Sequence, residues 1–281
     1  MDDISDITDY YNTEAEGEHA RLLRHQLEFE MTWRYLKRYL PPQGTLLEVG
    51  AATGRYTLPL AQRGYQVTAV DLSEVQLKRN RQRLAEAGLE SQVRLVAADA
   101  RDLSPVPGTD FDAVLLMGPL YHLVQEADRR LALQNVYARL KPGGVICSSF
   151  ISRLGLLGDL LKNVPNWIER QDEVRSVMDT GRDPAHYPRG SFRGYFARVD
   201  EIAPLHEAIG VEMLALAGVE PAISADDESY NRLEDAQRRL WLDLLDEISQ
   251  EPSILGASRH LLYVGRKPVG IEGYRLRSER R

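Results

Sequence analysis

The stretch Thr45–Asp71 reads TLLEVGAATGRYTLPLAQRGYQVTAVD and decides the fold. Residues 45–49 form an apolar run that predicts a strand, and residues 50–54 form a loop of small residues. A helix is predicted over 57–64, and a second strand over 66–70 runs into an acid. Strand, loop, helix and strand make one unit of a parallel sheet. Such units bind nucleotides at the carboxyl ends of their strands, where the loop lets a ligand approach the backbone.

The glycine spacing of this loop decides which nucleotide is expected. The dinucleotide fingerprint G-x-G-x-x-G would need glycines at 50, 52 and 55, but the chain has Gly50, Ala52 and Arg55. The pattern present is Glu48-x-Gly50-x-Ala52-x-Gly54. It resembles motif I of the class I S-adenosylmethionine (SAM) methyltransferases, E/D-x-G-x-G-x-G. Alanine replaces the middle glycine of that motif here, and we expect it to tighten the loop without closing it.

Three further segments extend the resemblance in the family's order. VRLVAAD (93–99) resembles the third strand, FDAVLL (111–116) the fourth, and LKPGGVI (140–146) the turn that enters the fifth. The resemblance covers residues 44–150. It implies an α/β fold, a doubly wound Rossmann-like sheet of seven strands with the last antiparallel, to which helical lid insertions are added.

The resemblance also implies SAM as the cofactor and assigns residues to it. Asp71 is expected to accept hydrogen bonds from the ribose, and Leu72 to flank the adenine. Asp99, through its side chain, and Ala100, through its backbone, are expected to recognise the adenine. The remaining cofactor contacts implied in this way are Tyr11, Arg21, Glu48, Gly50, Ala52, Gly54 and Met117.

The amino-terminal residues 1–43 are predicted to be an arm and a helix that act as a lid or cap. Residues 1–17 have no hydrophobic period, so we expect this segment to be loosely ordered on its own. Tyr11 is an aromatic residue in this polar stretch and needs a surface to pack on. The resemblance implies a lid contact with the cofactor, and a simple tether of the arm to the protein surface is the alternative.

Residues 18–40 predict one long helix, which Pro41 stops. A polar stripe beside its apolar surface includes Arg21, His25 and Glu28. These residues form either a solvated face or part of the site. In the second interpretation Arg21 meets the cofactor carboxylate, or His25 and Glu28 line a substrate cavity.

The fourth strand opens into MGPLYHL (117–123), which borders both the methyl group and the acceptor in the resembled fold. Gly118 and Pro119 predict an irregular backbone. Tyr121 and His122 supply an aromatic ring and a base, and imidazole, with a typical pKa near 6.5, can take a proton from an attacking group. We expect both to be catalytic residues, with His122 as the base. The alternative is a histidine that only hydrogen-bonds its own turn.

Domain organisation follows from these segments. The prediction places an N-terminal lid at 1–43, the SAM-binding core at 44–152, a helical insertion and substrate lid at 153–198, completion of the sheet at 199–268 with a second helical insertion at 226–250, and a basic tail at 269–281. For the helical insertions, thickening of the core or formation of a homodimer is the alternative to a lid.

Composition bounds the remaining choices. The chain has 281 residues, 43% of them hydrophobic, which suffices for a large core. It has no apolar run of 18 residues and an acidic N-terminus, so we expect no membrane span, no signal peptide and a cytoplasmic location. Cys147 is the single cysteine and cannot form an internal disulfide. The net charge of −7 disfavours nucleic-acid partners, and no metal-binding cluster is evident.

The expected function is transfer of a methyl group from SAM to N or O of a small molecule or short peptide. Met-Gly-Pro-Leu-Tyr-His stands after the fourth strand in place of an Asn-Pro-Pro-Tyr-like motif, which disfavours methylation of planar amide-like or adenine nitrogens. Two alternatives stay open: an RNA- or protein-modifying methyltransferase, and a SAM-binding protein without catalytic activity.

Overall fold

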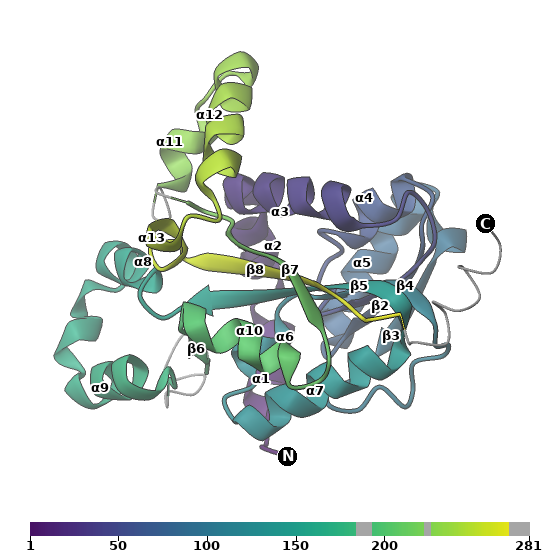
Figure 1. Cartoon of the computed structure of the whole chain (residues 1–281), viewed down its shortest axis with the longest axis horizontal. Coiled ribbons are helices and arrows are strands. Elements are labelled where there is room, and N and C mark those ends of the chain that lie inside the picture. Colours follow the sequence, from purple (N-terminus) through teal and green to yellow (C-terminus); the bar gives the residue numbers. More distant parts are fainter. Residues whose placement is uncertain (184–192, 222–225, 270–281) are drawn as a thin grey trace.

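The computed structural model describes residues 1–183, 193–221 and 226–269 (Figure 1). The basic tail predicted at 269–281 therefore lies outside the described residues, apart from Val269, as do residues 184–192 of the predicted insertion at 153–198. Eight strands form one sheet: β1 (Thr45–Val49), β2 (Gln66–Asp71), β3 (Val93–Ala97), β4 (Phe111–Leu116), β5 (Leu140–Ser152), β6 (Phe196–Ala197), β7 (Glu212–Gly218) and β8 (His260–Arg266).

The strand order is β3-β2-β1-β4-β5-β8-β7, and β6 pairs with the end of β5. Strands β1 to β5 are parallel, whereas β8 runs antiparallel to both β5 and β7. The predicted fold class, with its antiparallel last strand, is confirmed. The two-residue β6 is an addition that sequence periodicity could not reveal.

Helices cover both faces of this sheet (Figure 1). They are α1 (Ser5–Thr13), α2 (Ala15–Arg24), α3 (Gln26–Tyr39), α4 (Thr57–Gln62), α5 (Glu74–Glu86), α6 (Pro119–His122), α7 (Glu126–Arg139), α8 (Leu156–Asn163), α9 (Gln171–Thr180), α10 (Val199–Glu207), α11 (Asp227–Asn231), α12 (Asp235–Ile248) and α13 (Pro252–Leu255). Two short 3₁₀ turns lie at Glu90–Gln92 and Pro165–Glu169. In the part of the chain described, no helix is long and apolar enough to span a bilayer.

Side chains that alternate along the strands contribute to two hydrophobic cores. Leu47 and Val49 of β1 belong to the core under α7 and α10, while Leu46 belongs to the core under α3 and α4. Successive side chains of a strand point to opposite faces, and β1 has apolar residues on both faces, Leu46 on one and Leu47 and Val49 on the other. The short apolar run of β1 therefore needs a helical layer on each side.

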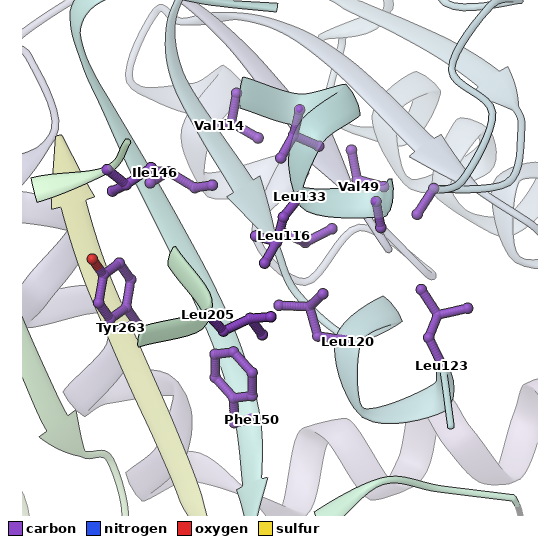
Figure 2. Packing of buried hydrophobic residues seen from close by; sticks show 14 of the residues in the cluster. Val49, Val114, Leu116, Leu120, Leu123, Leu133, Ile146, Phe150, Leu205 and Tyr263 are labelled. Atoms are coloured by element: carbon purple, nitrogen blue, oxygen red, sulfur yellow. The ribbon is translucent and has the colours of Figure 1, made fainter. Parts of the chain in front are cut away.

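The first core also fixes the turn that follows β4. Leu120 and Leu123 come from α6 and from the residue after it, and they pack among Leu116 and Phe150 (Figure 2). Both side chains are almost fully buried. Since these two anchors flank Tyr121 and His122, the backbone of the predicted catalytic pair is held by the core.

In the folded chain residues 5–13 of the amino-terminal segment form α1. Contacts with distant residues hold this segment in place. Arg101 donates to the carbonyl of Asp2 at 2.6 Å, and Arg193 pairs with Asp2 at 3.2 Å and with Asp6 at 3.0 Å. Pattern analysis of the segment alone could not detect these partners.

The prediction of one long helix over 18–40 is wrong, because α2 and α3 meet at His25. His25 has φ −81° and ψ 65°, which is not helical. Its side chain lies 2.7 Å from Asp227 and 2.8 Å from Arg259. Contacts with residues about 200 positions away accompany the break, and nothing in the local sequence announces it.

Both predicted helical insertions are helical. Residues 153–183 contain α8 and α9, and the second insertion contains α11 and α12, which project from the body beside α3 in Figure 1. Arg34 of α3 pairs with Asp243 of α12 at 2.5 Å. Their assignment as substrate lids stays a prediction.

Candidate active site

A cleft of about 1220 Å³, its open mouth included, lies at the carboxyl ends of β1 to β4. The amino end of β8 reaches the same edge because β8 is antiparallel, and His260 pairs with Ile151 near the end of β5. Helices α1 to α3 close the opposite side. The polar and charged residues of the lining are Tyr11, Arg21, Glu28, Thr32, Arg55, Tyr56, Asp71, Gln76, Asp99, Tyr121, His122, Ser149 and His260.

The loop after β1 has a backbone that few residues can adopt. Gly50 has φ +86°, and its N–H and that of Ala51 donate to the carbonyl of Val70 at 2.8 and 3.0 Å. A Cβ atom on Gly50 would lie 2.1 Å from the carbonyl oxygen of Met117. Ala52 has φ +46°, so the alanine that departs from the family motif takes a left-handed backbone conformation that favours glycine.

Asp71 stands at the end of β2 and braces this loop. Its carboxylate accepts hydrogen bonds from the N–H groups of Ala52 at 2.8 Å and Ser73 at 2.9 Å. The residue is half-buried and lines the cleft. A carboxylate has about four lone-pair sites and accepts hydrogen bonds from hydroxyl groups as well as from backbone N–H groups.

Glu48 and Gly54 lie behind the loop and are not among the described residues that line the cleft. Glu48 is fully buried and accepts a hydrogen bond from Thr57 at 2.6 Å. Burial raises the pKa of Glu48 to about 8, and the charge of Asp71 acts in the same direction. A protonated, neutral Glu48 therefore supports the loop from below, and its direct contact with a cofactor stays a prediction, as does that of Gly54.

Asp99 and Ala100 line the cleft beyond β3, together with Leu72. The carboxylate of Asp99 binds the Arg101 guanidinium, with distances of 2.9 Å to Nε and 2.6 Å to Nη2. Arg101 also donates to Asp128 at 2.8 Å. Asp99 thus has a fixed orientation, and adenine recognition by its remaining lone pairs is still a prediction.

Two residues predicted for different roles meet directly. The Tyr11 hydroxyl of α1 lies 2.6 Å from Nε2 of His122 in α6, and the two rings are edge to face at 5.3 Å. Asn12 of the same helix contacts the Ser73 hydroxyl at 2.7 Å. Helix α1 is therefore connected both to the end of β2 and to the turn after β4. Tyr121 and Met117 line the cleft as well.

The polar stripe of the predicted long helix divides at His25. Arg21 and Glu28 line the cleft, whereas His25 is not among the described lining residues. Instead His25, Glu220 and Asp227 bring possible metal-ligand atoms within 4.8 Å of one another. Nη2 of Arg259 lies 2.8 Å from His25, 2.5 Å from Glu220 and 3.8 Å from Asp227. A guanidinium thus supplies the positive charge that a metal ion would otherwise bring.

Sequence reasoning missed several lining residues, among them Arg55, Tyr56, Ser149 and His260. His260 could have been found, because the start of an antiparallel strand lies at the same edge as the ends of its parallel neighbours. Its Nδ1 lies 2.6 Å from Glu220. Ser149 accepts a hydrogen bond from the N–H of Gly118 at 3.1 Å, a contact that requires the β4–β5 register.

Comparisons with known proteins find similarity in sequence and in fold. Residues 46–144 match the family described as "Methyltransferase domain". A tRNA 5-carboxymethoxyuridine methyltransferase of Escherichia coli K12 is 31% identical over 138 residues, which cover 47% of this chain and 51% of that protein. A ubiquinone biosynthesis O-methyltransferase of Caulobacter vibrioides is 35% identical over 109 residues, with coverages of 39% and 41%.

Structural similarity extends further along the chain than sequence similarity. A SAM-dependent methyltransferase from Methanosarcina mazei has a TM-score of 0.56 at 16% identity, covering 84% of this chain and 97% of that one. At an identity this low, the structural similarity shows a shared fold and nothing further. The chain spans about half or less of the length of the two curated relatives, and the match to them is confined to one part of each protein.

Proposed function

We propose that this chain, whose residues 46–144 form a methyltransferase domain of the class I SAM-dependent type, transfers a methyl group from SAM to N or O of a small molecule or short peptide. The observation that carries the proposal is the placement of Asp71 beside the Gly50 loop, in a cleft that also holds Tyr121 and His122. The wall with Asp71 and the Gly50 loop can then hold the nucleoside, while the wall with Tyr121 and His122 faces a methyl acceptor.

The residues of the cleft fit this cofactor. A side chain at Gly50 would collide with the Met117 carbonyl, so glycine allows the loop after β1 and the turn after β4, which both line the cleft, to approach each other closely. Asp71 would hold the ribose hydroxyls, and Leu72 and Ala100 offer apolar surface for the adenine. Arg21 would meet the carboxylate. When bound, SAM supplies an electrophilic methyl group on a sulfonium.

The chain's own contribution to catalysis is alignment and removal of a proton. Holding the nucleophile in line with the methyl group lowers the entropic part of the barrier. His122 sits on a turn that the core anchors, and it would accept a proton from the acceptor. Tyr11 and Tyr121 would position His122 and exclude water at the mouth of the cleft.

The alternatives are less well supported. The relative from Escherichia coli is named as a tRNA methyltransferase. The net charge of −7, however, gives this chain no general attraction for a polyanion such as RNA. A SAM-binding protein without catalysis would need no base beside the cleft. The presence of His122 in the lining of the cleft supports the enzyme over that alternative.

Replacement of Asp71 by alanine tests the cofactor assignment. Loss of charge-assisted hydrogen bonds should weaken binding of S-adenosylhomocysteine (SAH) by about 1.5 to 3 kcal/mol, roughly 10- to 150-fold. Isothermal titration of both proteins with SAH measures the difference.

Asp102→Ala is the matched control, since it removes an exposed carboxylate that is not among the residues lining the cleft. This variant should bind SAH like the parent. Equal affinity of Asp71→Ala and the parent protein refutes the ribose assignment.

A further inference from the structure

The cleft has two chemically different halves, and the second half bears on the acceptor in the proposed function. Loop residues after β1 to β4 form the first half. The second is formed by α3 together with β5 and β8, which supply Glu28, Thr32, Ser149 and His260. Since the cofactor motif belongs to β1 to β4, the half beside β5 and β8 is left for the acceptor.

Glu28 brings a carboxylate into this second half. It lies in the first turn of α3, and its side chain is 18% exposed. Among the described residues, its Oε2 atom is buried and has no hydrogen-bond partner. Nη1 of Arg55 lies 3.9 Å from this oxygen, which is beyond hydrogen-bond distance. The Arg55 guanidinium instead donates to the carbonyls of Leu22 and His25.

The surroundings keep Glu28 ionised. Burial by itself would raise the pKa of Glu28, and Glu220 acts in the same direction, but the electrostatic interactions with His260, Arg55 and His25 outweigh them and hold this pKa below its usual range. Glu28 is therefore a poor proton acceptor near neutral pH. It is well suited to accept a hydrogen bond from a ligand.

An ionised carboxylate oxygen that is buried without a donor is costly, and a ligand N–H group removes that cost. The neighbouring lining is apolar or aromatic, with Tyr56, Val219 and Leu262 close to the same wall. The half-site thus combines one anionic acceptor with apolar surface. This combination suits a compact organic cation.

We propose that Glu28 selects the methyl acceptor as an amine, binding its N–H groups on an apolar body in the half of the cleft beside β5 and β8. The proposal rests on the proposed function and names its acceptor class. The same carboxylate could meet the amino group of the cofactor's own amino-acid portion. The experiment therefore measures cofactor and acceptor binding separately.

Three probes of matched size separate the chemistries: 2-phenylethylamine, 2-phenylethanol and phenylacetate carry an amine, a hydroxyl and a carboxylate. Each is titrated calorimetrically into protein saturated with SAH. The amine should bind with an affinity at least about tenfold higher than that of the alcohol or the carboxylate. Glu28→Gln should remove this preference by weakening amine binding about tenfold, while its SAH affinity stays that of the parent.

Glu30→Gln is the matched control, because it makes the same charge change on the same helix outside the cleft. Glu30 contacts the Tyr230 hydroxyl at 2.6 Å and is not among the described lining residues. This variant should keep the preference for the amine. A thermal melt without ligand checks the fold of both variants: Glu28→Gln should melt at or above the parent's midpoint, because it loses an unbonded charge.

The other outcomes overturn the inference. Tighter or equal binding of phenylethanol or phenylacetate contradicts it, as does amine binding that Glu28→Gln leaves unchanged. Absence of binding by all three probes to SAH-loaded protein also counts against it. A loss of SAH affinity in Glu28→Gln reassigns the carboxylate to the cofactor's amino group, and a lower melting midpoint reassigns it to the fold. Failure of the parent to bind SAH removes the proposed function itself.

Discussion

Replacing Gly50 with alanine is expected to lower the free energy of unfolding by about 3 kcal/mol and to abolish cofactor binding. The backbone at Gly50 has φ +86°, which strains any residue with a Cβ atom. The added methyl group would also lie 2.1 Å from the Met117 carbonyl oxygen and 2.7 Å from Cδ of Pro119. Either the loop or the turn after β4 must move, and both border the cleft. Chemical denaturation and SAH titration measure the two effects.

Gly64→Ala separates strain from collision. Gly64 has φ +88°, but a Cβ atom there would meet nothing within 4 Å. The control should therefore show only the backbone cost, about 1 kcal/mol, and bind SAH like the parent. Equal destabilisation of the two variants, or normal SAH binding by Gly50→Ala, contradicts the role given to this loop.

Replacing His122 with alanine is expected to lower kcat at least tenfold, because proton abstraction typically contributes a factor of about 10² to 10⁴. The imidazole lies on the turn after β4 and lines the cleft. Its contact with the Tyr11 hydroxyl at 2.6 Å gives it a second role as an anchor for α1. Steady-state release of SAH and titration with SAH measure catalysis and cofactor binding separately.

Tyr11→Phe and Tyr121→Phe divide the two roles of His122. If His122 is the base, Tyr11→Phe should affect kcat far less than His122→Ala, because the imidazole remains. Tyr121→Phe should also have the smaller effect. If His122 only anchors α1, then His122→Ala and Tyr11→Phe should weaken SAH binding alike and leave kcat intact. A variant with full turnover and reduced thermal stability would make His122 a structural turn residue.

The predictable part of this molecule is the part encoded locally. The apolar runs of β1 and β4, the glycine loop and the acid at Asp71 follow one another at fixed spacing, so the sheet and the lining of the cleft at the ends of β1 to β4 could be predicted. Gly118 also has the expected irregular backbone, with φ +119°. In these elements the local preference and the final fold agree.

The part that could not be predicted depends on contacts distant in sequence. Helix α1 lacks a hydrophobic period and is held through Arg101 and Arg193. The break at His25 accompanies contacts with Asp227 and Arg259. The half of the cleft beside β5 and β8 forms only when these two strands pair. Until that pairing is known, His260 cannot be placed in the same cleft as Glu28. Such pairings become visible only in the folded chain.

The central claim is that the cleft at the ends of β1 to β4 binds SAM with its ribose at Asp71. A crystal structure of the chain with SAH measures this directly. The account predicts ribose hydroxyls within hydrogen-bond distance of the Asp71 carboxylate, and the adenine beside Leu72 within hydrogen-bond distance of Asp99 or the Ala100 N–H. SAH bound elsewhere, or with its adenine beyond hydrogen-bond distance of both Asp99 and Ala100, contradicts it.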